Sequence, residues 1–239
     1  MTDLASPKTA LVTGGSRGIG LAVARALVSA GVRVALVARG AEELETRRVE
    51  LGRDTVVVAG DVSDAKDVDR IVEAVRKAFG DVPDIFVNNA GIFIPKPLHA
   101  LSADEFERTM QVNLIAPFYL LRALLPAWRA QRRGHLISIG SRADRTIFAD
   151  NGGYSASKFG IRAMHEVMRE ETRGTGVRAT LVSPGTVDTP IWDTVTLPKD
   201  NRFPPRDQML RAEVVADAVV WAATRPANVN IDELRITAS

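Results

Sequence analysis

A tyrosine and a lysine four residues apart are the side chains of this sequence best suited to acid–base chemistry. They are Tyr154 and Lys158, in the run Tyr-Ser-Ala-Ser-Lys. Residues four apart share one face of a helix, so the ammonium can lie beside the phenol. A nearby cation favours the ionised phenol and lowers a pKa that is about 10 in a free tyrosine. Because general acid–base catalysis works best when the catalytic pKa is near the operating pH, the pair predicts a tyrosine that exchanges protons with a substrate.

A glycine-rich segment near the start of the chain predicts where a phosphate-bearing ligand binds. Gly14, Gly18 and Gly20 follow an apolar run and open an amphipathic stretch. The backbone N–H groups of such a strand-to-helix turn can receive a pyrophosphate. The spacing Gly-x-x-x-Gly-x-Gly differs from the Gly-x-Gly-x-x-Gly of many dinucleotide-binding folds, and an ordinary tight turn can carry the same glycines. Together with the tyrosine and the lysine, the turn predicts redox chemistry on a bound dinucleotide.

The residues after the second expected strand bear on which dinucleotide binds. In NAD-binding folds an acidic residue about 20 positions beyond the glycines holds the ribose hydroxyls. Here that place holds Ala38 and Arg39. Arg39, with Arg17 from the glycine turn, can hold a 2′-phosphate that a carboxylate would repel. The sequence therefore favours NADP(H). NAD(H) stays possible, because both arginines can be solvated and Glu42 or Glu43 can reach the ribose.

Short aliphatic runs alternate with longer amphipathic segments, a pattern typical of βα units and a parallel sheet. The seven expected strands are Thr9–Val12, Arg33–Val37, Thr55–Ala59, Ile85–Val87, His135–Ile139, Arg178–Val182 and Glu233–Ile236. Helices are expected to start near Gly18, Ala41, Asp64, Ala103, Gly153 and Glu213, the fourth with a capping box formed by Ser102 and Glu105. The proline-rich stretch from Thr186 to about Arg211, with Trp192 and Phe203, is the candidate substrate loop.

Composition narrows the function classes. A length of 239 residues without an internal linker indicates one α/β domain, residues 1–239. A net charge of +2 gives no argument for nucleic acid or membrane. The absence of cysteine excludes disulfides and thiolate sites, and the three histidines lack ligand spacing, so no metal is expected. No apolar stretch reaches about 18 residues, and no apolar signal core precedes the first strand, so the protein is expected to be cytoplasmic.

Four further motifs occur in order: Asn88-Asn89-Ala90-Gly91, Asn113, Ser141 thirteen residues before the tyrosine, and Pro184-Gly185. With them, the chain from Thr9 to about Ile236 resembles the short-chain dehydrogenase/reductase family, of the NADP(H)-preferring carbonyl reductase type. The resemblance implies a Rossmann fold with one doubly wound parallel sheet of about seven strands flanked by helices. It also implies an oxidoreductase that interconverts a ketone or aldehyde and an alcohol.

The resemblance implies roles for particular residues. Tyr154 would give a proton to the substrate carbonyl, Ser141 would hydrogen-bond the same oxygen, Lys158 would tune the phenol and hold the nicotinamide ribose, and Asn113 would help retain a water. The implied cofactor-binding residues are Gly14, Ser16, Arg17, Gly18, Ile19, Gly20, Arg39, Asp61, Val62, Asn89, Ala90, Gly91, Tyr154, Lys158, Pro184, Gly185, Val187 and Thr189. The implied substrate pocket contains Phe93, Ser141, Arg142, Phe148, Tyr154 and Trp192, with Ile92, Ile94, Ala143, Ile147 and Thr186 nearby.

The position of Pro117 bears on the implied water. It lies four residues after Asn113 and has no N–H to close the helical bond to the Asn113 carbonyl. A bound water can satisfy that oxygen. The alternative is that Pro117 only kinks a long helix over the core.

The chain departs from the family pattern at two places. Ser141-Arg142-Ala143-Asp144 replaces the common Ser-x-Ala-Gly, and aspartate tolerates a positive φ better than most residues, so the turn can survive. The C-terminus lacks the Asp-Gly-Gly ending of many tetrameric members. A homodimer or homotetramer is expected through the helices at Ala103–Ala130 and Gly153–Arg173, and the sequence does not choose between them.

The apolar pocket favours a hydrophobic carbonyl substrate. Arg142 or Arg145 can instead meet an acidic group, or pair with Asp144 or Asp150. A rival function is a 3-oxoacyl carrier-protein reductase, with a basic landing surface formed by Arg129, Arg132, Arg133 and Arg173; cations at a helix end explain three of these equally well. A non-catalytic NADPH-binding sensor would need none of Tyr154, Lys158 and Ser141, yet all three are present.

Overall fold

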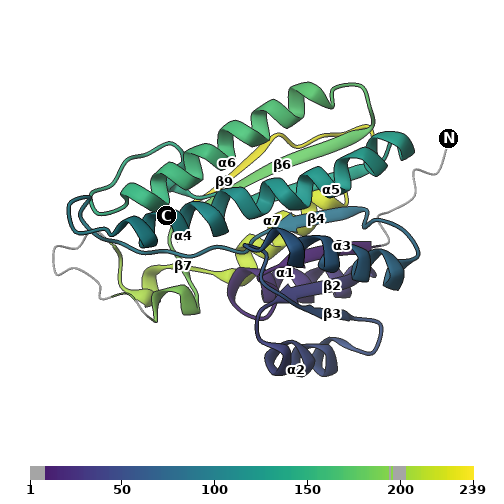
Figure 1. The fold of residues 1–239 in the computed structure, drawn as a ribbon, viewed down its shortest axis with the longest axis horizontal. Coiled ribbons are helices and arrows are strands. Elements are labelled where there is room, and N and C mark those ends of the chain that lie inside the picture. The colour runs from purple at the N-terminus through teal and green to yellow at the C-terminus, as the bar shows by residue number, and fades with distance from the viewer. Residues whose placement is uncertain (1–8, 194, 196–202) are drawn as a thin grey trace.

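One parallel sheet of seven strands organises the molecule, as the computed structural model of residues 9–193, 195 and 203–239 describes it. The strand order is β3-β2-β1-β4-β5-β6-β9 (Figure 1). The strands are β1 Thr9–Thr13, β2 Arg33–Ala38, β3 Val56–Ala59, β4 Ile85–Asn88, β5 Gly134–Ile139, β6 Val177–Pro184 and β9 Glu233–Ile236. The order reverses direction between β1 and β4, and in open α/β sheets ligands bind at such a switch point beyond the carboxyl ends of the strands.

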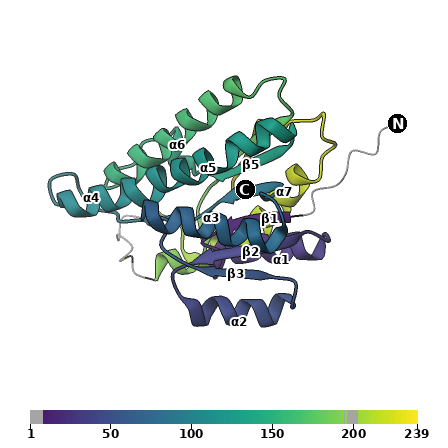
Figure 2. The same cartoon turned by 45° about the vertical axis from the view of Figure 1, so that its right-hand side comes forward.

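Helices cover both faces of the sheet (Figures 1 and 2). They are α1 Gly18–Ser29, α2 Ala41–Leu51, α3 Ala65–Phe79, α4 Ala103–Met110, α5 Ala116–Gln131, α6 Gly152–Glu171 and α7 Ala212–Ala223. One hydrophobic cluster joins the sheet to α1 and α7, and a second joins the opposite face to α3 and α5. Strands that are buried on both faces read as continuous aliphatic runs in the sequence, which is why all seven could be predicted.

Local signals set the ends of several helices. Ser102 accepts a hydrogen bond from the Glu105 N–H while the Glu105 carboxylate accepts one from the Ser102 N–H, so the predicted capping box is present at the start of α4. The Asp64 side chain likewise caps α3 by accepting from the Lys66 N–H. These bonds satisfy N–H groups that a helix start leaves without partners.

The expected substrate loop contains short regular elements that the sequence did not indicate. β7 Val187–Asp188 and β8 Leu210–Arg211 pair in parallel as a separate two-stranded sheet. Short 3₁₀ turns occupy Pro190–Trp192 and Arg206–Gln208. Two-residue strands are too short to show an alternating pattern. Residues 194 and 196–202 of the predicted loop lie outside the described residues.

Gly134, at the start of β5, makes a prediction about stability. A Cβ built there would lie 2.3 Å from atoms of the Trp128 ring, which is fully buried and donates from Nε1 to the Pro83 carbonyl at 2.7 Å. Gly134→Ala should therefore lower the free energy of unfolding by about 1–3 kcal/mol through overpacking. The measurement is the urea midpoint. Gly40→Ala is the matched control, since its nearest new contact is an ordinary 3.6 Å; equal midpoints in both variants would contradict the packing argument.

Candidate active site

A cavity of about 1300 Å³ opens at the carboxyl ends of the central strands. Pockets for one small ligand are usually about 300–1,000 Å³, so this cavity has room for a large ligand or for two. All the cofactor and pocket residues implied by the resemblance line it, apart from Gly20. Asn113 does not line it either. The structure thus brings residues from distant parts of the chain to one place.

The glycine turn between β1 and α1 forms one wall. Gly14 and Gly18 have φ values of +64° and +56°, a region in which other residues are strained. A Cβ at Gly20 would lie 2.2 Å from the Gly14 carbonyl oxygen. Gly20 therefore allows the turn to close, although it does not face the cavity. Among the described residues, no side chain caps the start of α1 at Arg17, so its first N–H groups point toward the cavity end of the helix as donors for an anion.

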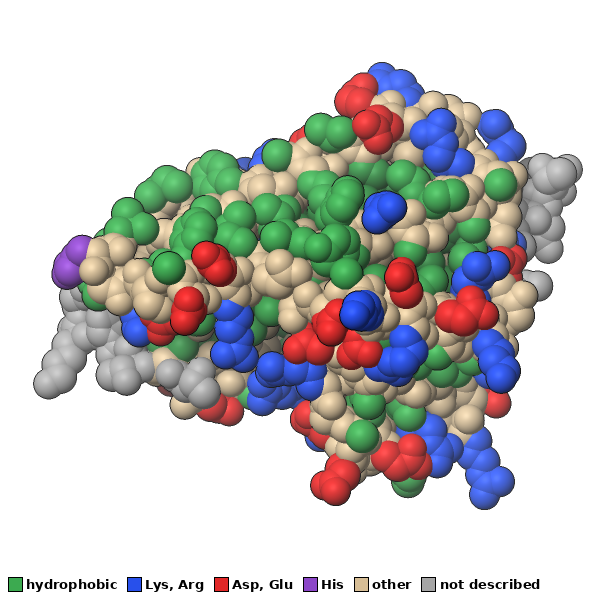
Figure 3. Space-filling model, in the orientation of Figure 1, with side chains coloured by type: hydrophobic (Ala, Val, Ile, Leu, Met, Phe, Trp, Pro, Cys, Tyr) green, Lys and Arg blue, Asp and Glu red, His purple; other side chains and the backbone are tan. Residues whose placement is uncertain are grey.

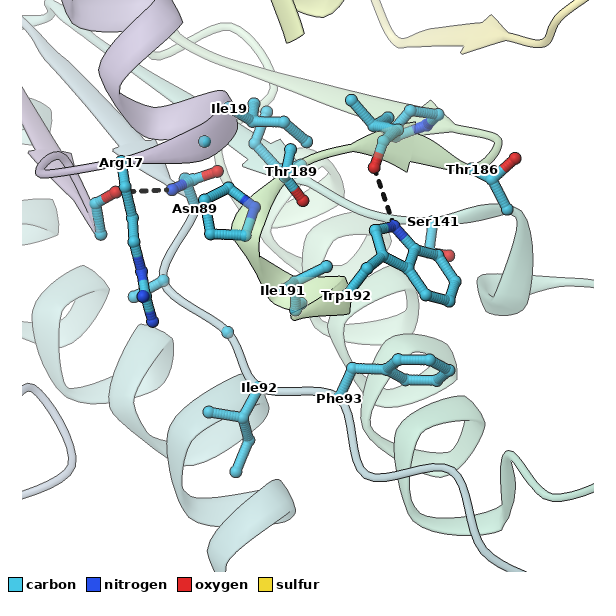
Figure 4. Close-up of a pocket in the computed structure, with 18 of the residues that line it drawn as sticks. Arg17, Ile19, Asn89, Ile92, Phe93, Ser141, Thr186, Thr189, Ile191 and Trp192 are labelled. Atoms are coloured by element: carbon cyan, nitrogen blue, oxygen red, sulfur yellow. Dashed lines mark hydrogen bonds between the residues drawn. The ribbon is translucent and has the colours of Figure 1, made fainter. Parts of the chain in front are cut away.

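Hydrogen bonds hold the segment after β4, at Asn89 and Ala90, against this turn. The Asn89 side chain donates to the Thr13 carbonyl at 2.9 Å, and the Thr13 hydroxyl accepts from the N–H groups of Asn89 and Ala90 at 3.1 and 3.2 Å. Figure 4 shows Asn89 beside the turn that carries Arg17 and Ile19. These bonds fix two walls of the cavity relative to each other.

Charged side chains gather at the end of the cavity near the glycine turn. Arg17 and Arg39 are exposed and line it, as do Glu43 and Asp61. Glu42 does not line it, so Glu43 is the carboxylate that could compete for a ribose. Burial raises the pKa of Asp61, but hydrogen bonds from Ser63 and the charge of Arg39 outweigh burial, and the pKa is lowered. Asp61 is therefore an anion at neutral pH.

Tyr154 and Lys158 face each other on α6, as their spacing predicted. The ammonium lies 5.6 Å from the centroid of the phenol ring and donates to the Ile139 carbonyl at 2.9 Å. The expected lowering of the Tyr154 pKa was wrong for this structure: burial of the phenol raises it, a hydrogen bond from Ser141 lowers it, and Asp144 raises it. Burial lowers the pKa of Lys158 to about 8. At neutral pH the phenol is thus protonated, the form that can donate a proton.

Ser141 begins a short 3₁₀ helix, Arg142–Asp144, directly after β5. Its hydroxyl accepts from the Ala143 N–H at 3.1 Å, and the Asp144 N–H donates to its carbonyl at 2.9 Å. The suggested positive φ at Asp144 was wrong, because among the described residues only Arg132 and Asp150 have one without being glycine. The turn survives because Asp144 is helical and its side chain points inward.

Asn113 acts through its side chain on two neighbouring segments. Its amide donates to the Ile92 carbonyl at 3.0 Å and to the Ser157 hydroxyl at 3.1 Å, and its oxygen accepts from the Ile92 N–H at 2.8 Å. The backbone here is a π turn, Gln111–Ile115, in which the Ala116 N–H donates to the Gln111 carbonyl. Because the hydrogen bond of this turn runs five residues back and not four, the missing N–H of Pro117 does not by itself leave the Asn113 carbonyl without a helical partner.

Aromatic rings wall the other end of the cavity. The Phe93 ring lies 4.9 Å from that of Tyr154 and 5.4 Å from that of Trp192, and the Trp192 and Phe203 rings are 5.2 Å apart. Trp192 is held by a hydrogen bond from Nε1 to the Val187 carbonyl at 2.9 Å, and it faces Phe93 in Figure 4. Two residues expected nearby, Ile94 and Ile147, do not line this cavity, and Ile147 is 72% exposed.

The two candidate pocket arginines have different surroundings. Arg145 is paired with Asp144 and Glu233. Arg142 lines the cavity with its guanidinium 5.1 Å from the centroid of the Phe148 ring, and no carboxylate among the described residues pairs with it. Arg142 is therefore the pocket arginine that remains available to a ligand.

Sequence reasoning missed one wall altogether. Thr237, Ala238 and Ser239 line the cavity, although nothing in their residue types indicates it. Their place follows from β9, which pairs with β6 and delivers the last residues to the carboxyl edge of the sheet. Only the strand register, which the sequence does not contain, could have located them.

The proposed carrier-protein surface lies away from the cavity. Arg129 and Arg132 donate to the carbonyls of Glu171 and Gly174, and Arg133 pairs with Asp84. These groups surround the amino end of β5, whereas Ser141 follows its carboxyl end. The arginines thus stabilise loops at the opposite edge of the sheet.

Comparisons with known proteins agree with this geometry. The short chain dehydrogenase family model matches residues 8–200. An uncharacterized oxidoreductase of Staphylococcus haemolyticus is 32% identical over 99% of this chain and 99% of its own. A metagenomic short-chain oxidoreductase solved with NADP is 34% identical, with a TM-score of 0.82 over 98% of both chains. A 3-ketoacyl-(acyl-carrier-protein) reductase from Brucella melitensis, solved with NADH, is 26% identical, with a TM-score of 0.89 over 98% of both chains.

The parallel sheet, the glycine turn at its switch point and the similarity along the whole chain define a Rossmann-like oxidoreductase that depends on NAD or NADP. The chain belongs to the short-chain dehydrogenase family.

Proposed function

We propose that the protein is an NADPH-dependent reductase that converts a ketone or aldehyde to an alcohol. The observation that carries this proposal is the convergence of Tyr154, Lys158 and Ser141 on the cavity whose other end is the glycine turn. A protonated phenol at neutral pH suits the reducing direction, in which it gives a proton to the developing alkoxide.

The cavity suits a dinucleotide. The glycine turn at Gly14 and Gly20 allows close approach to a pyrophosphate, which the N–H groups at the start of α1 would bind. Arg17 and Arg39 would bind a 2′-phosphate. The remaining cofactor contacts would come from the residues named above for the resemblance. The nicotinamide, when bound, supplies the hydride, and the protein supplies alignment and electrostatics.

The side chains would divide the proton chemistry among them. Ser141 donates a hydrogen bond to the carbonyl oxygen, since its own oxygen already accepts from the Ala143 N–H. Tyr154 gives its proton to the same oxygen. Lys158 stabilises the phenolate that this leaves, by opposite charge. Asn113 holds the segment at Ile92 against α6. From the family resemblance alone, we propose that Asn113 also helps to retain a water that returns the proton.

The aromatic rings around Phe93 favour an apolar substrate. The guanidinium of Arg142 would donate hydrogen bonds to an acidic group at the edge of the pocket. The experiment is oxidation of NADPH and of NADH by the purified protein with ketones, aldehydes, oxo acids and 3-oxoacyl thioesters. Turnover of a carbonyl compound with NADPH supports the proposal. Binding of NADPH without turnover of any compound would instead support the sensor.

A 3-oxoacyl carrier-protein reductase is the second candidate, favoured by the similarity to the Brucella enzyme. The position of Arg129, Arg132 and Arg133 at the far edge of the sheet counts against a landing surface there. A thioester on carrier protein turned over faster than the same free thioester would favour this candidate. Either reductase is proposed to act in the cytoplasm.

We propose that the protein forms a homodimer or homotetramer through α4, α5 and α6. Apolar side chains gather over α4 and α5 on the face drawn in Figure 3. The exposed large apolar side chains of α4, α5 and α6 include Phe106, Phe118, Phe159 and Val167. Exposed apolar patches of this kind mark interaction surfaces. A second copy of the chain would cover them.

Light scattering at micromolar concentration should give the mass of a dimer or tetramer, and Phe118→Glu should give a monomer, because a buried unpaired carboxylate is costly. Val49→Glu, at an apolar residue on α2 that is 73% exposed against 48% for Phe118, is the control and should leave the mass unchanged. A monomeric unsubstituted protein would refute the proposed assembly.

A further inference from the structure

A buried carboxylate lies directly behind the turn that carries Ser141. Asp144 has no exposed surface. Its Oδ2 accepts a hydrogen bond from the Ser183 hydroxyl at 2.5 Å and a longer one from the Ser141 N–H at 3.4 Å. Burial of a carboxylate is costly unless it is paired and hydrogen-bonded. These bonds connect the serine turn to β6 at the residue before Pro184.

Two guanidinium groups and a second carboxylate complete the surroundings of Asp144. Arg145 Nε lies 2.8 Å from its Oδ1 and Arg162 Nη1 lies 3.9 Å from it. Both arginines also pair with Glu233 on β9. The four charges sum to zero, but Asp144 is fully buried while the side chains of the other three are 21–29% exposed. Its field is the one least screened by water.

The backbone makes room for this carboxylate. A Cβ at Gly140 would lie 2.7 Å from Asp144 Oδ2 and 2.8 Å from the Ser183 hydroxyl oxygen. The Gly140 N–H donates to the Val182 carbonyl at 2.8 Å, which keeps the ends of β5 and β6 together. The absence of a side chain at Gly140 therefore permits the contact between Asp144 and Ser183.

The charge of Asp144 reaches the two groups that exchange protons. It raises the pKa of Tyr154, in the same direction as burial, and it raises the pKa of Lys158, against the larger effect of burial. The charged groups packed around it are Arg145 on the same turn, Arg162 and Lys158 from α6 and Glu233 from β9. Removal of its charge would thus favour the phenolate and the neutral amine together.

Resting on the reductase function proposed above, we propose that Asp144 is a positioning residue: it holds the Ser141 turn against β6 and places a buried negative charge near Tyr154 and Lys158. Ser141, Tyr154 and Lys158 are the groups that touch the substrate or cofactor, and Asp144 acts through them.

The test uses the full chain with Asp144→Asn and, as a second variant, Asp144→Gly. In each, the alkaline limb of the pH profile of kcat/KM for reduction should move to lower pH. At a pH on the limb of the unsubstituted protein, the loss should be roughly three- to tenfold, since one pH unit is a tenfold change in ionisation. Glu233→Gln is the matched control. It removes a carboxylate from the same cluster that pairs with Arg145 and Arg162 and, among the described residues, makes no hydrogen bond to Ser141 or Ser183. The alkaline limb of its pH profile should stay in place.

A second readout needs no substrate. The chain has two tyrosines, so in a Tyr119→Phe background the ultraviolet titration of phenolate reports Tyr154 alone. Its midpoint should also fall in Asp144→Asn and Asp144→Gly. An unchanged midpoint in a folded variant, or an equal shift in Glu233→Gln, would overturn the role of Asp144. A shifted midpoint without turnover of any carbonyl compound would refute the reductase function alone.

Discussion

Replacement of Tyr154 by Phe is expected to lower kcat/KM for carbonyl reduction by about 10²- to 10⁴-fold, the contribution of a positioned general acid. The variant should still fold, because the edge contact with the Phe93 ring needs only an aromatic ring at this position. It should also bind NADPH as before, since the phosphate-binding end of the cavity is unchanged. Steady-state kinetics and cofactor titration by fluorescence measure the two quantities separately.

Tyr119→Phe is the matched control for this substitution. It removes the same hydroxyl from the other tyrosine of the chain, which lies on α5 and does not line the cavity. Its kinetics should equal those of the unsubstituted protein. Activity in Tyr154→Phe within about threefold of that control would contradict the role of the phenol as proton donor.

Loss of Arg39 or Arg17 is expected to weaken NADPH binding and leave NADH binding nearly unchanged. A charge-assisted hydrogen bond contributes about 1.5–3 kcal/mol, which is roughly a 10- to 100-fold rise in Kd. Arg39→Gln and Arg17→Gln should each show this rise for NADPH, and the double variant should prefer neither cofactor. Isothermal titration with both cofactors gives the Kd values.

Arg25→Gln provides the comparison, because Arg25 lies on α1 with its guanidinium paired to Glu50 and does not line the cavity. Its Kd values should not change. A larger effect of Arg39→Gln on NADH than on NADPH, or tighter binding of NADH by the unsubstituted protein, would reverse the proposed cofactor preference. Glu43, which lines that end of the cavity together with Asp61, would then be the ribose ligand to test.

The strands and most helix starts could be predicted because their signals are local. β1 and β2 are aliphatic runs next to glycine turns, and the capping box at Ser102 predicts the start of α4. The spacing of Tyr154 and Lys158 also placed both on one face of α6. Each of these inferences needs only residues within one turn or one strand of each other.

Other features depend on contacts between distant segments. The spacing of Tyr154 and Lys158 could not show that burial of the phenol outweighs the ammonium, because burial depends on the whole fold. Asp144 meets Ser183, 39 residues further along the chain, only once β5 and β6 are paired. The C-terminal wall of the cavity likewise follows from the register of β9 on β6. A sequence gives residue types at these places and not their partners.

Transfer of deuterium from labelled NADPH tests the central claim most directly. The purified protein would be incubated with a panel of carbonyl compounds and with NADPH that carries deuterium at the transferable position of the nicotinamide. Proton donation by Tyr154 coupled to hydride transfer predicts an alcohol with deuterium on the former carbonyl carbon, formed about 10²- to 10⁴-fold more slowly by Tyr154→Phe. Unlabelled products throughout, or labelled alcohol formed equally fast by the variant, would contradict a Tyr154-dependent reductase.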